Sequence, residues 1–340
     1  MFSICDERPP LWLNFEAGLA SPGGSVPGDG IAHIVSQTIP HDMVVFGLLA
    51  EGMDSDGNDS LQWGINFRSS RQQDWWFQTR PQSIGFAPVL LVAGSTGEPF
   101  IWPEPRLLRR GEEIQLHIKR KANTGLCYVR VSLLGARLKV DARGRVRDEL
   151  AEYDREDRGY AALIVESSDI ETSGTTCVPG PAITDYFHLG SLKYDFVFSQ
   201  ASLIVRDPNE STLWTPLTGV RGELQIRDSG RSHSLSVGQS WIPWSFFGGQ
   251  TQEAGQQETA LRSVASEIGA SWRIRQDAGF ELSARVVKAG VSPVRLMLAL
   301  HGRRDSLQGR VATLDEMSAD DCPPDPRAAM LERAYPFGGY

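Results

Sequence analysis

Two stretches of this chain, residues 110–137 and 278–304, carry the same alternating apolar pattern around a polar turn. Gly111 aligns with Gly279, and Gly135 aligns with Gly302 after a slip of one residue in the turn. The apolar positions then match in phase: Ile114, Leu116, Ile118, Val129, Val131 and Leu133 in the first stretch, and Leu282, Ala284, Val286, Leu296, Leu298 and Leu300 in the second. Alternation of this kind predicts half-buried β-strands, and a single long repeat predicts two similar domains.

Further short runs of β-forming residues are separated by Gly, Pro, Asn and Asp. Such spacing, without long helical periods, predicts an all-β chain of two tandem antiparallel β-sandwich or jelly-roll-like domains. The segments 65–71 and 224–231 also resemble each other, which widens the repeat. The expected strand runs are 43–49, 61–67, 89–93, 114–118 and 128–134 in the first half, and 194–198, 201–205, 223–227, 280–287 and 294–300 in the second.

The pattern divides the chain into four parts. We expect a first sandwich over 1–141, a charged or flexible linker over 142–181, and a second sandwich, the internal repeat of the first, over 182–306. Residues 307–340 are expected to form a tail with a short helix, because Asp325 and Pro326 make a good helix start.

Composition excludes several classes of protein. Apolar residues make up 41% of the 340 residues and charged residues 22%, as in ordinary globular domains, so disorder is disfavoured. The net charge of −8 argues against a nucleic-acid-binding surface. The first ten residues lack the pattern of a secretory signal, and no apolar run is long enough to span a membrane, so no membrane partner is expected. The four cysteines, Cys5, Cys127, Cys177 and Cys322, are expected to be free thiols.

Motifs of catalysis and cofactor binding are missing, so we expect no enzyme and no cofactor. The segment Gly238–Ile242 lacks the second glycine of a nucleophile elbow, and the six histidines have no metal-ligand spacing. The segment Asp54–Asp59 comes closest to a calcium loop, but its glycine and glutamate positions are wrong, which favours an ordinary turn. Spacing alone cannot pair the carboxylates that a glycosidase would need: Glu98, Glu104, Asp185 and Glu281.

Tryptophans are numerous, and four of them occupy comparable places in the two copies: Trp75, Trp76, Trp241 and Trp244. Large aromatic side chains fill sandwich cores, form subunit interfaces or stack on sugars, and the sequence leaves all three open. The last residues carry three more aromatic candidates for a docking arm: Tyr335, Phe337 and Tyr340.

Each copy ends in a Gly-x-Arg sequence, at Gly135 and at Gly302. In this, and in its tandem sandwiches, the chain resembles structural proteins of tailed bacteriophage virions. The resemblance implies a head, vertex, collar or tail component that is made in the host cytoplasm and resides in the virion. It also implies self-association and contacts with other virion proteins. The alternative is a lectin-like carbohydrate-binding protein that uses its exposed aromatics.

Overall fold

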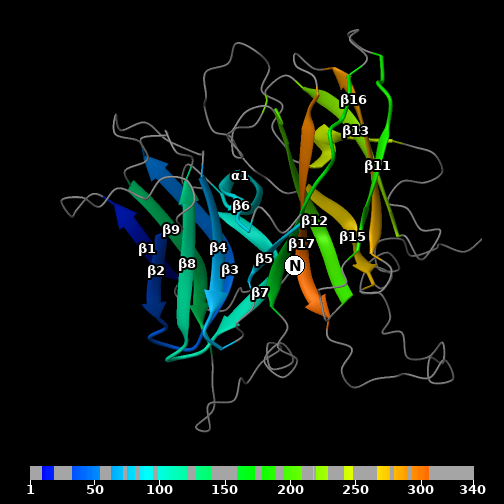
Figure 1. Cartoon of the computed structure of the whole chain (residues 1–340). Coiled ribbons are helices and arrows are strands. Elements are labelled where there is room, and N and C mark those ends of the chain that lie inside the picture. The colour runs from blue at the N-terminus through cyan, green and yellow to red at the C-terminus, as the bar shows by residue number, and fades with distance from the viewer. Residues whose placement is uncertain are drawn as a thin grey trace, which may run out of the picture. The chain divides into compact units, whose positions relative to one another are not determined.

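In the computed structural model, the described residues of both halves are mainly strands (Figure 1). The predicted C-terminal helix and tail, the Asp54–Asp59 loop and the candidates Tyr335, Phe337 and Tyr340 lie outside the described residues. The described residues are 10–18, 33–53, 63–71, 75–80, 85–94, 99–120, 128–138, 159–172, 178–188, 195–208, 217, 220–228, 241–247, 266–275, 279–288 and 293–305.

Among these residues, the first half forms two four-stranded sheets. The order of one sheet is β1-β9-β3-β7, and that of the other is β2-β8-β4-β6. All neighbouring strands in both sheets are antiparallel. The strands are β1 (Pro10–Gly18), β2 (His33–Thr38), β3 (Met43–Met53), β4 (Trp63–Ser69), β6 (Ala87–Pro88), β7 (Phe100–Leu108), β8 (Glu113–Arg120) and β9 (Tyr128–Arg137).

The second half has a sheet of order β15-β12-β17-β10-β5 and a sheet of order β11-β16-β13-β14. The strand β5 (Phe77–Arg80) comes from the first half and joins the edge of this sheet by parallel pairing with β10. The other strands are β10 (Tyr160–Glu166), β11 (Ile183–Phe187), β12 (Asp195–Arg206), β13 (Arg221–Asp228), β14 (Ile242–Pro243), β15 (Ser266–Ile274), β16 (Phe280–Lys288) and β17 (Arg295–Asp305).

The two halves have the same strand order. Replacing β1, β9, β3 and β7 by β10, β17, β12 and β15 reproduces one sheet, and β2, β8, β4 and β6 correspond to β11, β16, β13 and β14 in the other. A single short helical turn follows the corresponding strand in each half: α1 (Val89–Val92) after β6 and the 3-10 turn η1 (Trp244–Phe247) after β14. Eight antiparallel strands in two sheets with this order form a jelly roll. The predicted all-β class is therefore confirmed, with one jelly roll in each half.

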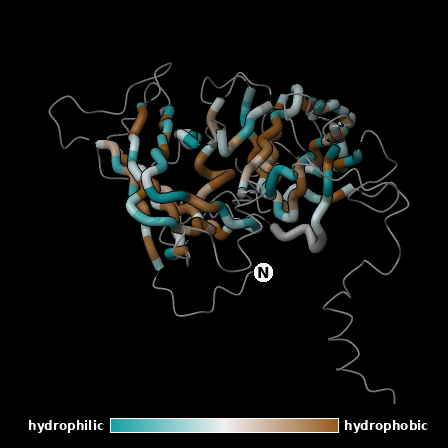
Figure 2. Tube along the Cα trace, turned by 90° about the horizontal axis from the view of Figure 1, so that it is seen from below, coloured by the Kyte–Doolittle hydropathy of each residue, from teal (hydrophilic) through white to brown (hydrophobic). Residues whose placement is uncertain are grey.

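Burial follows the pleat of the strands. The twelve apolar positions matched in the sequence are all buried with at most 1% exposure, as their phase predicts. Two large clusters result, one in each jelly roll, and the first also includes Tyr160, Ile204 and Met297 from the second half. Figure 2 shows the brown, apolar stretches running along the strands.

The structure corrects two expectations. Residues 160–166 lie within the range predicted as linker, yet they form β10, in which every residue is buried. The charged sequence just before residues 160–166 favoured a linker, whereas this short apolar run forms a strand that is buried on both faces. The run 89–93 was expected to be a strand, but residues 89–92 form α1, whose four apolar side chains are all buried. The other proposed domain bounds stay predictions.

Gly135 and Gly302 each permit a close approach of two strands at a bulge. Gly135 pairs with Val45 in β3, and the register shifts directly after this pair. Gly302 pairs with Phe198 in β12, and the register again shifts directly after this pair. A Cβ on Gly135 would clash with the Val44 carbonyl oxygen, and one on Gly302 with that of Val197. Only glycine fits where a neighbouring backbone comes this near.

Candidate functional site

The two jelly rolls meet on the outer face of the sheet that contains β10, β17 and β12. Residues that point away from the second core, including Ile204, Met297 and Ala299, belong to the core cluster of the first jelly roll. Helix α1 contacts β12 and β17, and β5 pairs with β10 from Ala162 to Val165. The junction therefore combines apolar packing with backbone hydrogen bonding, which makes the two jelly rolls one compact unit.

A chain of buried hydrogen bonds crosses this junction. The Tyr160 hydroxyl lies 2.8 Å from Nδ1 of His301, and Nε2 of His301 lies 2.9 Å from Oγ of Ser202. The Ser202 hydroxyl donates to the carbonyl oxygen of Leu91 at 2.7 Å. Since a carbonyl only accepts, the serine proton is committed to Leu91, so His301 donates from Nε2 and accepts from Tyr160 at Nδ1. This order joins β10, β17 and β12 to α1.

The same order defines what the group can do chemically. A serine nucleophile donates its proton to an imidazole base, whereas Ser202 accepts from His301. The His301 side chain has 0% exposure. Burial lowers the pKa of His301 to about 3 and raises the pKa of the Tyr160 hydroxyl well above its ordinary value. The side chains of this hydrogen-bond chain thus stay neutral at ordinary pH. They also supply a hydrogen-bond donor to the Leu91 carbonyl, which has no partner within α1.

Aromatic and charged side chains surround Tyr160. The ring of Trp102 stacks on the ring of Tyr160 at a centroid distance of 4.2 Å and an interplanar angle of 9°. The Arg106 guanidinium lies 4.5 Å from the ring centroid of Trp76 and donates to the Tyr160 carbonyl oxygen at 2.7 Å. Arg303 pairs with Glu104 across the same junction. These directional contacts, together with the apolar packing, fix the orientation of the two jelly rolls at the junction.

The corresponding outer face of the first jelly roll presents apolar side chains to solvent. Trp12, Leu134, Gly47 and Ile101 are register partners across all four strands of the sheet β1-β9-β3-β7. Trp12 is 46% exposed and Ile101 is 49% exposed. Beside this row lies a small cluster of buried apolar residues, Val44, Leu107, Ala136 and Leu138, with the partly buried Phe46 packed against it. We name this surface the β1–β7 face, defined by Trp12, Phe46, Ile101 and Leu134.

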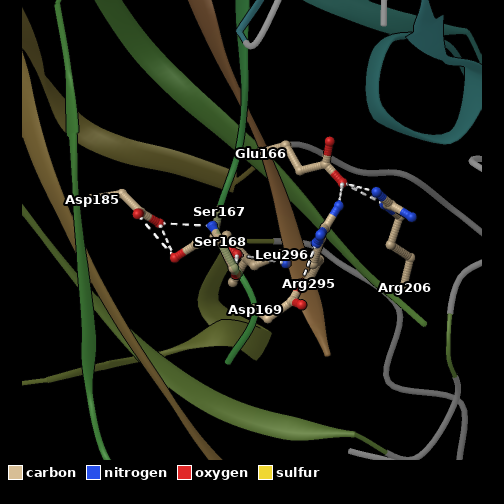
Figure 3. A network of polar contacts seen from close by, with 8 residues as sticks. All are labelled: Glu166, Ser167, Ser168, Asp169, Asp185, Arg206, Arg295 and Leu296. Carbon is tan, nitrogen blue, oxygen red and sulfur yellow. Dashed lines mark hydrogen bonds and ion pairs between the residues drawn. The ribbon is translucent and has the colours of Figure 1, made fainter. Parts of the chain in front are cut away.

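A polar network holds the connection that follows β10 (Figure 3). Glu166 and Arg206 form a buried ion pair, with Nε of Arg206 2.5 Å from Oε1 of Glu166. Arg295 pairs with Asp169 and lies 3.9 Å from Glu166. Asp185 of β11 accepts a 2.8 Å hydrogen bond from the Ser168 backbone N–H. The network therefore ties the two sheets of the second jelly roll together.

The four predicted tryptophans divide into two kinds. Trp76 has 0% exposure and Trp244 has 3%, so both fill cores. Trp75 is 37% exposed, with its ring against His117, and the Trp241 ring lies 4.2 Å from the Arg285 guanidinium. His117 and Arg285 lie equally far along the chain from Gly111 and Gly279, on outward positions of β8 and β16.

The carboxylates considered from the sequence do not share an interaction in the described part of the chain. Glu104 pairs with Arg303, Asp185 binds Ser168, and Glu281 is the register partner of Tyr186 and Arg227. Glu98 lies outside the described residues. Within those residues, no group of three or more His, Cys, Asp or Glu side chains could hold a metal ion. No helix in the same ranges is long and apolar enough to cross a membrane.

Sequence reasoning missed the junction residues Tyr160, Ser202 and His301. Tyr160 lay inside the expected linker, and His301 was treated as one of six scattered histidines. The usable signal was local: a histidine in an otherwise apolar strand, directly before a glycine that has a counterpart in the first half.

No protein-family model and no curated protein matches this chain. Among solved structures, it is similar to the major capsid protein of STIV, with 10% identity, a TM-score of 0.38 and coverage of 90% of this chain and 99% of that one. It is also similar to PNGase F, a glycosylasparaginase from Flavobacterium meningosepticum, with 7% identity, a TM-score of 0.32 and coverage of 86% and 96%. A structure of Sulfolobus Turreted Icosahedral Virus matches with 12% identity, a TM-score of 0.19 and coverage of 87% and 60%.

Proposed function

We propose that this chain is a structural protein of a virion and forms part of its shell. The observation that carries the proposal is the repeated strand order: two jelly rolls in one chain, joined through β5 and β10. Jelly rolls are a common architecture of viral capsid proteins, and they also occur in lectins and cupins. A tailed bacteriophage as the source, and a head, vertex, collar or tail position, are the finer parts of this proposal.

The junction suits a shell subunit because it joins the two jelly rolls rigidly. Its contacts are apolar packing, a parallel strand pair and a buried hydrogen-bond chain, rather than exposed ion pairs alone. Exposed ion pairs contribute about 0–1 kcal/mol each, whereas buried apolar area contributes about 25 cal/mol per Å². A junction of this kind holds both jelly rolls in one fixed orientation, as a regular array of subunits requires.

The test is the presence of this chain in particles. Particles from cells that naturally make the chain are separated on a density gradient, and the chain is quantified by mass spectrometry across the fractions. We expect it to co-sediment with the particles in many copies per particle. Its confinement to fractions of free protein would overturn the proposed function.

One observation favours a glycan-binding surface as the second candidate. Trp75 and Trp241 lie against outward side chains at corresponding positions of the two jelly rolls. Indole rings on a β-sandwich surface can stack on sugar rings. A glycan array with the full chain and with Trp75→Ala and Trp241→Ala variants tests this. Sugar binding that is lost in both variants would favour the lectin-like function.

A further inference from the structure

The β1–β7 face has a counterpart in the second jelly roll that is already occupied. In that half, Ala162, His301 and Gln200 form the row that corresponds to Trp12, Leu134 and Gly47. Helix α1 and the rest of the first jelly roll cover the face around this row, because α1 contacts β12 and β17 and receives the hydrogen bond from Ser202. The same face is thus buried in one half and exposes Trp12 and Ile101 in the other.

The second jelly roll also carries the counterpart of α1. The turn η1 follows β14 as α1 follows β6. All four apolar residues of α1 are buried. In η1, Trp244 and Phe247 are buried in the second core, but Phe246 is 47% exposed. An exposed side chain on the turn, Phe246, and two on the face, Trp12 and Ile101, therefore remain. The turn and the face correspond to the two partners that meet at the junction.

We propose that η1 of one copy docks on the β1–β7 face of a second copy and repeats between chains the contact that α1 makes within each chain. The exposed Phe246 ring would pack on the row in which Leu134 and Ile101 flank Gly47 and Trp12 lies beyond Leu134. The Ile101 side chain lies against Gly47. Large exposed apolar side chains that cluster on a surface mark contact sites between proteins. The occupant is a second copy of this chain because the matching contact is one that the chain itself supplies.

This contact is heterologous, since a turn on one copy meets a sheet face on the next. Each copy then keeps one unused turn and one unused face, so association continues until a ring closes or a lattice forms. The inference deepens the proposed shell function and rests on it, because a shell needs a contact that repeats between copies.

Two variants block the two sides of the contact separately. Ile101→Glu places a charge on the β1–β7 face, and Phe246→Glu places a charge on η1. Both side chains are about half exposed, so circular dichroism and thermal unfolding should show an intact fold. Sedimentation velocity of the full chain should show oligomers for the wild type. Each variant should have an apparent Kd raised by about 30-fold or more, as expected for a contact at the centre of an interface.

The decisive experiment mixes the two variants in equal amounts. Ile101→Glu keeps a working turn and Phe246→Glu keeps a working face, so the mixture should form a dimer of two chains that does not grow further. The control Tyr186→Glu changes a side chain that is 64% exposed on β11 of the other sheet and should assemble as the wild type does.

Other outcomes would overturn the inference. If two β1–β7 faces bound each other, Phe246→Glu would still associate and mixing would restore nothing. A wild type that stays monomeric at all concentrations, or a Tyr186→Glu variant that loses assembly, would also contradict it. Detection of the chain in particles is measured independently, so the shell function can stand or fail separately from this contact.

Discussion

Leu134 and His301 occupy the same position in the two jelly rolls of this chain. Each lies on the outer face of its sheet, directly before the glycine that pairs next to a strand bulge. Leu134 is partly exposed on the β1–β7 face, whereas His301 has 0% exposure and bonds to Tyr160 and Ser202. The same fold thus places a partly exposed leucine on this face in the first jelly roll and a buried, hydrogen-bonded histidine on the corresponding face in the second.

The buried state of His301 makes the stability of the fold depend on pH. Its pKa is lowered to about 3 in the folded chain, against the ordinary 6.5. The unfolded chain binds the proton more readily than the folded chain. The contribution of neutral His301 to the free energy of unfolding is therefore fully present above pH 6.5 and is lost as pH falls from 6.5 toward 3. The total loss should be on the order of 5 kcal/mol.

The measurement is urea unfolding at several pH values for the wild type and for His301→Gln. The variant should be less stable at pH 7, and its free energy of unfolding should fall less steeply between pH 6.5 and 4. Parallel curves for the two proteins would contradict the assignment of this pH dependence to His301.

The hydrogen-bond chain should behave as a coupled unit. Ser202→Ala removes the partner of both the Leu91 carbonyl and His301 Nε2, and should cost about 1–3 kcal/mol of unfolding free energy. Tyr160→Phe removes the donor to Nδ1. A double-mutant cycle by chemical unfolding should give a coupling energy of about 0.5 kcal/mol or more. Additive losses would show that the hydrogen bonds act independently.

Gly302 should tolerate no side chain. An added Cβ would meet the Val197 carbonyl oxygen, so Gly302→Ala must displace β12 or β17 at the junction and should cost about 3 kcal/mol or more. The matched control is Gly85→Ala, where φ is +63° and the structure leaves space for a Cβ. That change should cost only about 1–2 kcal/mol. Equal losses of thermal stability in the two variants would contradict the close approach.

The buried ion pair between Glu166 and Arg206 predicts that a single substitution destabilises the fold more than replacement of both residues. Both side chains are nearly buried, so Glu166→Gln leaves a charge with a weakened partner and should cost about 3–5 kcal/mol. Replacing both residues, as Glu166→Leu with Arg206→Met, should return the unfolding free energy to within about 2 kcal/mol of the wild type. A double variant less stable than Glu166→Gln would contradict this pattern and show that one of the two residues has another essential contact, such as that of Glu166 with Arg295.

Much of the fold could be predicted from local pattern. The alternation in β8, β9 and β16 identified the buried positions correctly, because these strands have one face on a core. In β17 the matched positions are also buried, but Met297 and Ala299 on its other face are buried in the first core as well. Strand β10 was missed because it is buried on both faces and therefore lacks alternation. Helix α1 was missed because its residues are all apolar and the sequence holds no capping signal.

The candidate site was harder to predict for a physical reason. Trp76 and Trp244 share a residue type with Trp75 and Trp241, and only tertiary packing separates the two buried indoles from the exposed Trp75 and the partly exposed Trp241. Trp12 and Ile101 come from distant segments, and their place in one row depends on sheet order and register. Such a juxtaposition requires the structure.

Cryo-electron microscopy of particles from cells that make this chain shows directly whether the chain is a shell subunit. We expect density for this chain as a repeating shell subunit with two jelly rolls, joined by parallel pairing of β5 with β10. A shell map in which no subunit fits this fold, obtained from particles that also lack the chain by mass spectrometry, would contradict it.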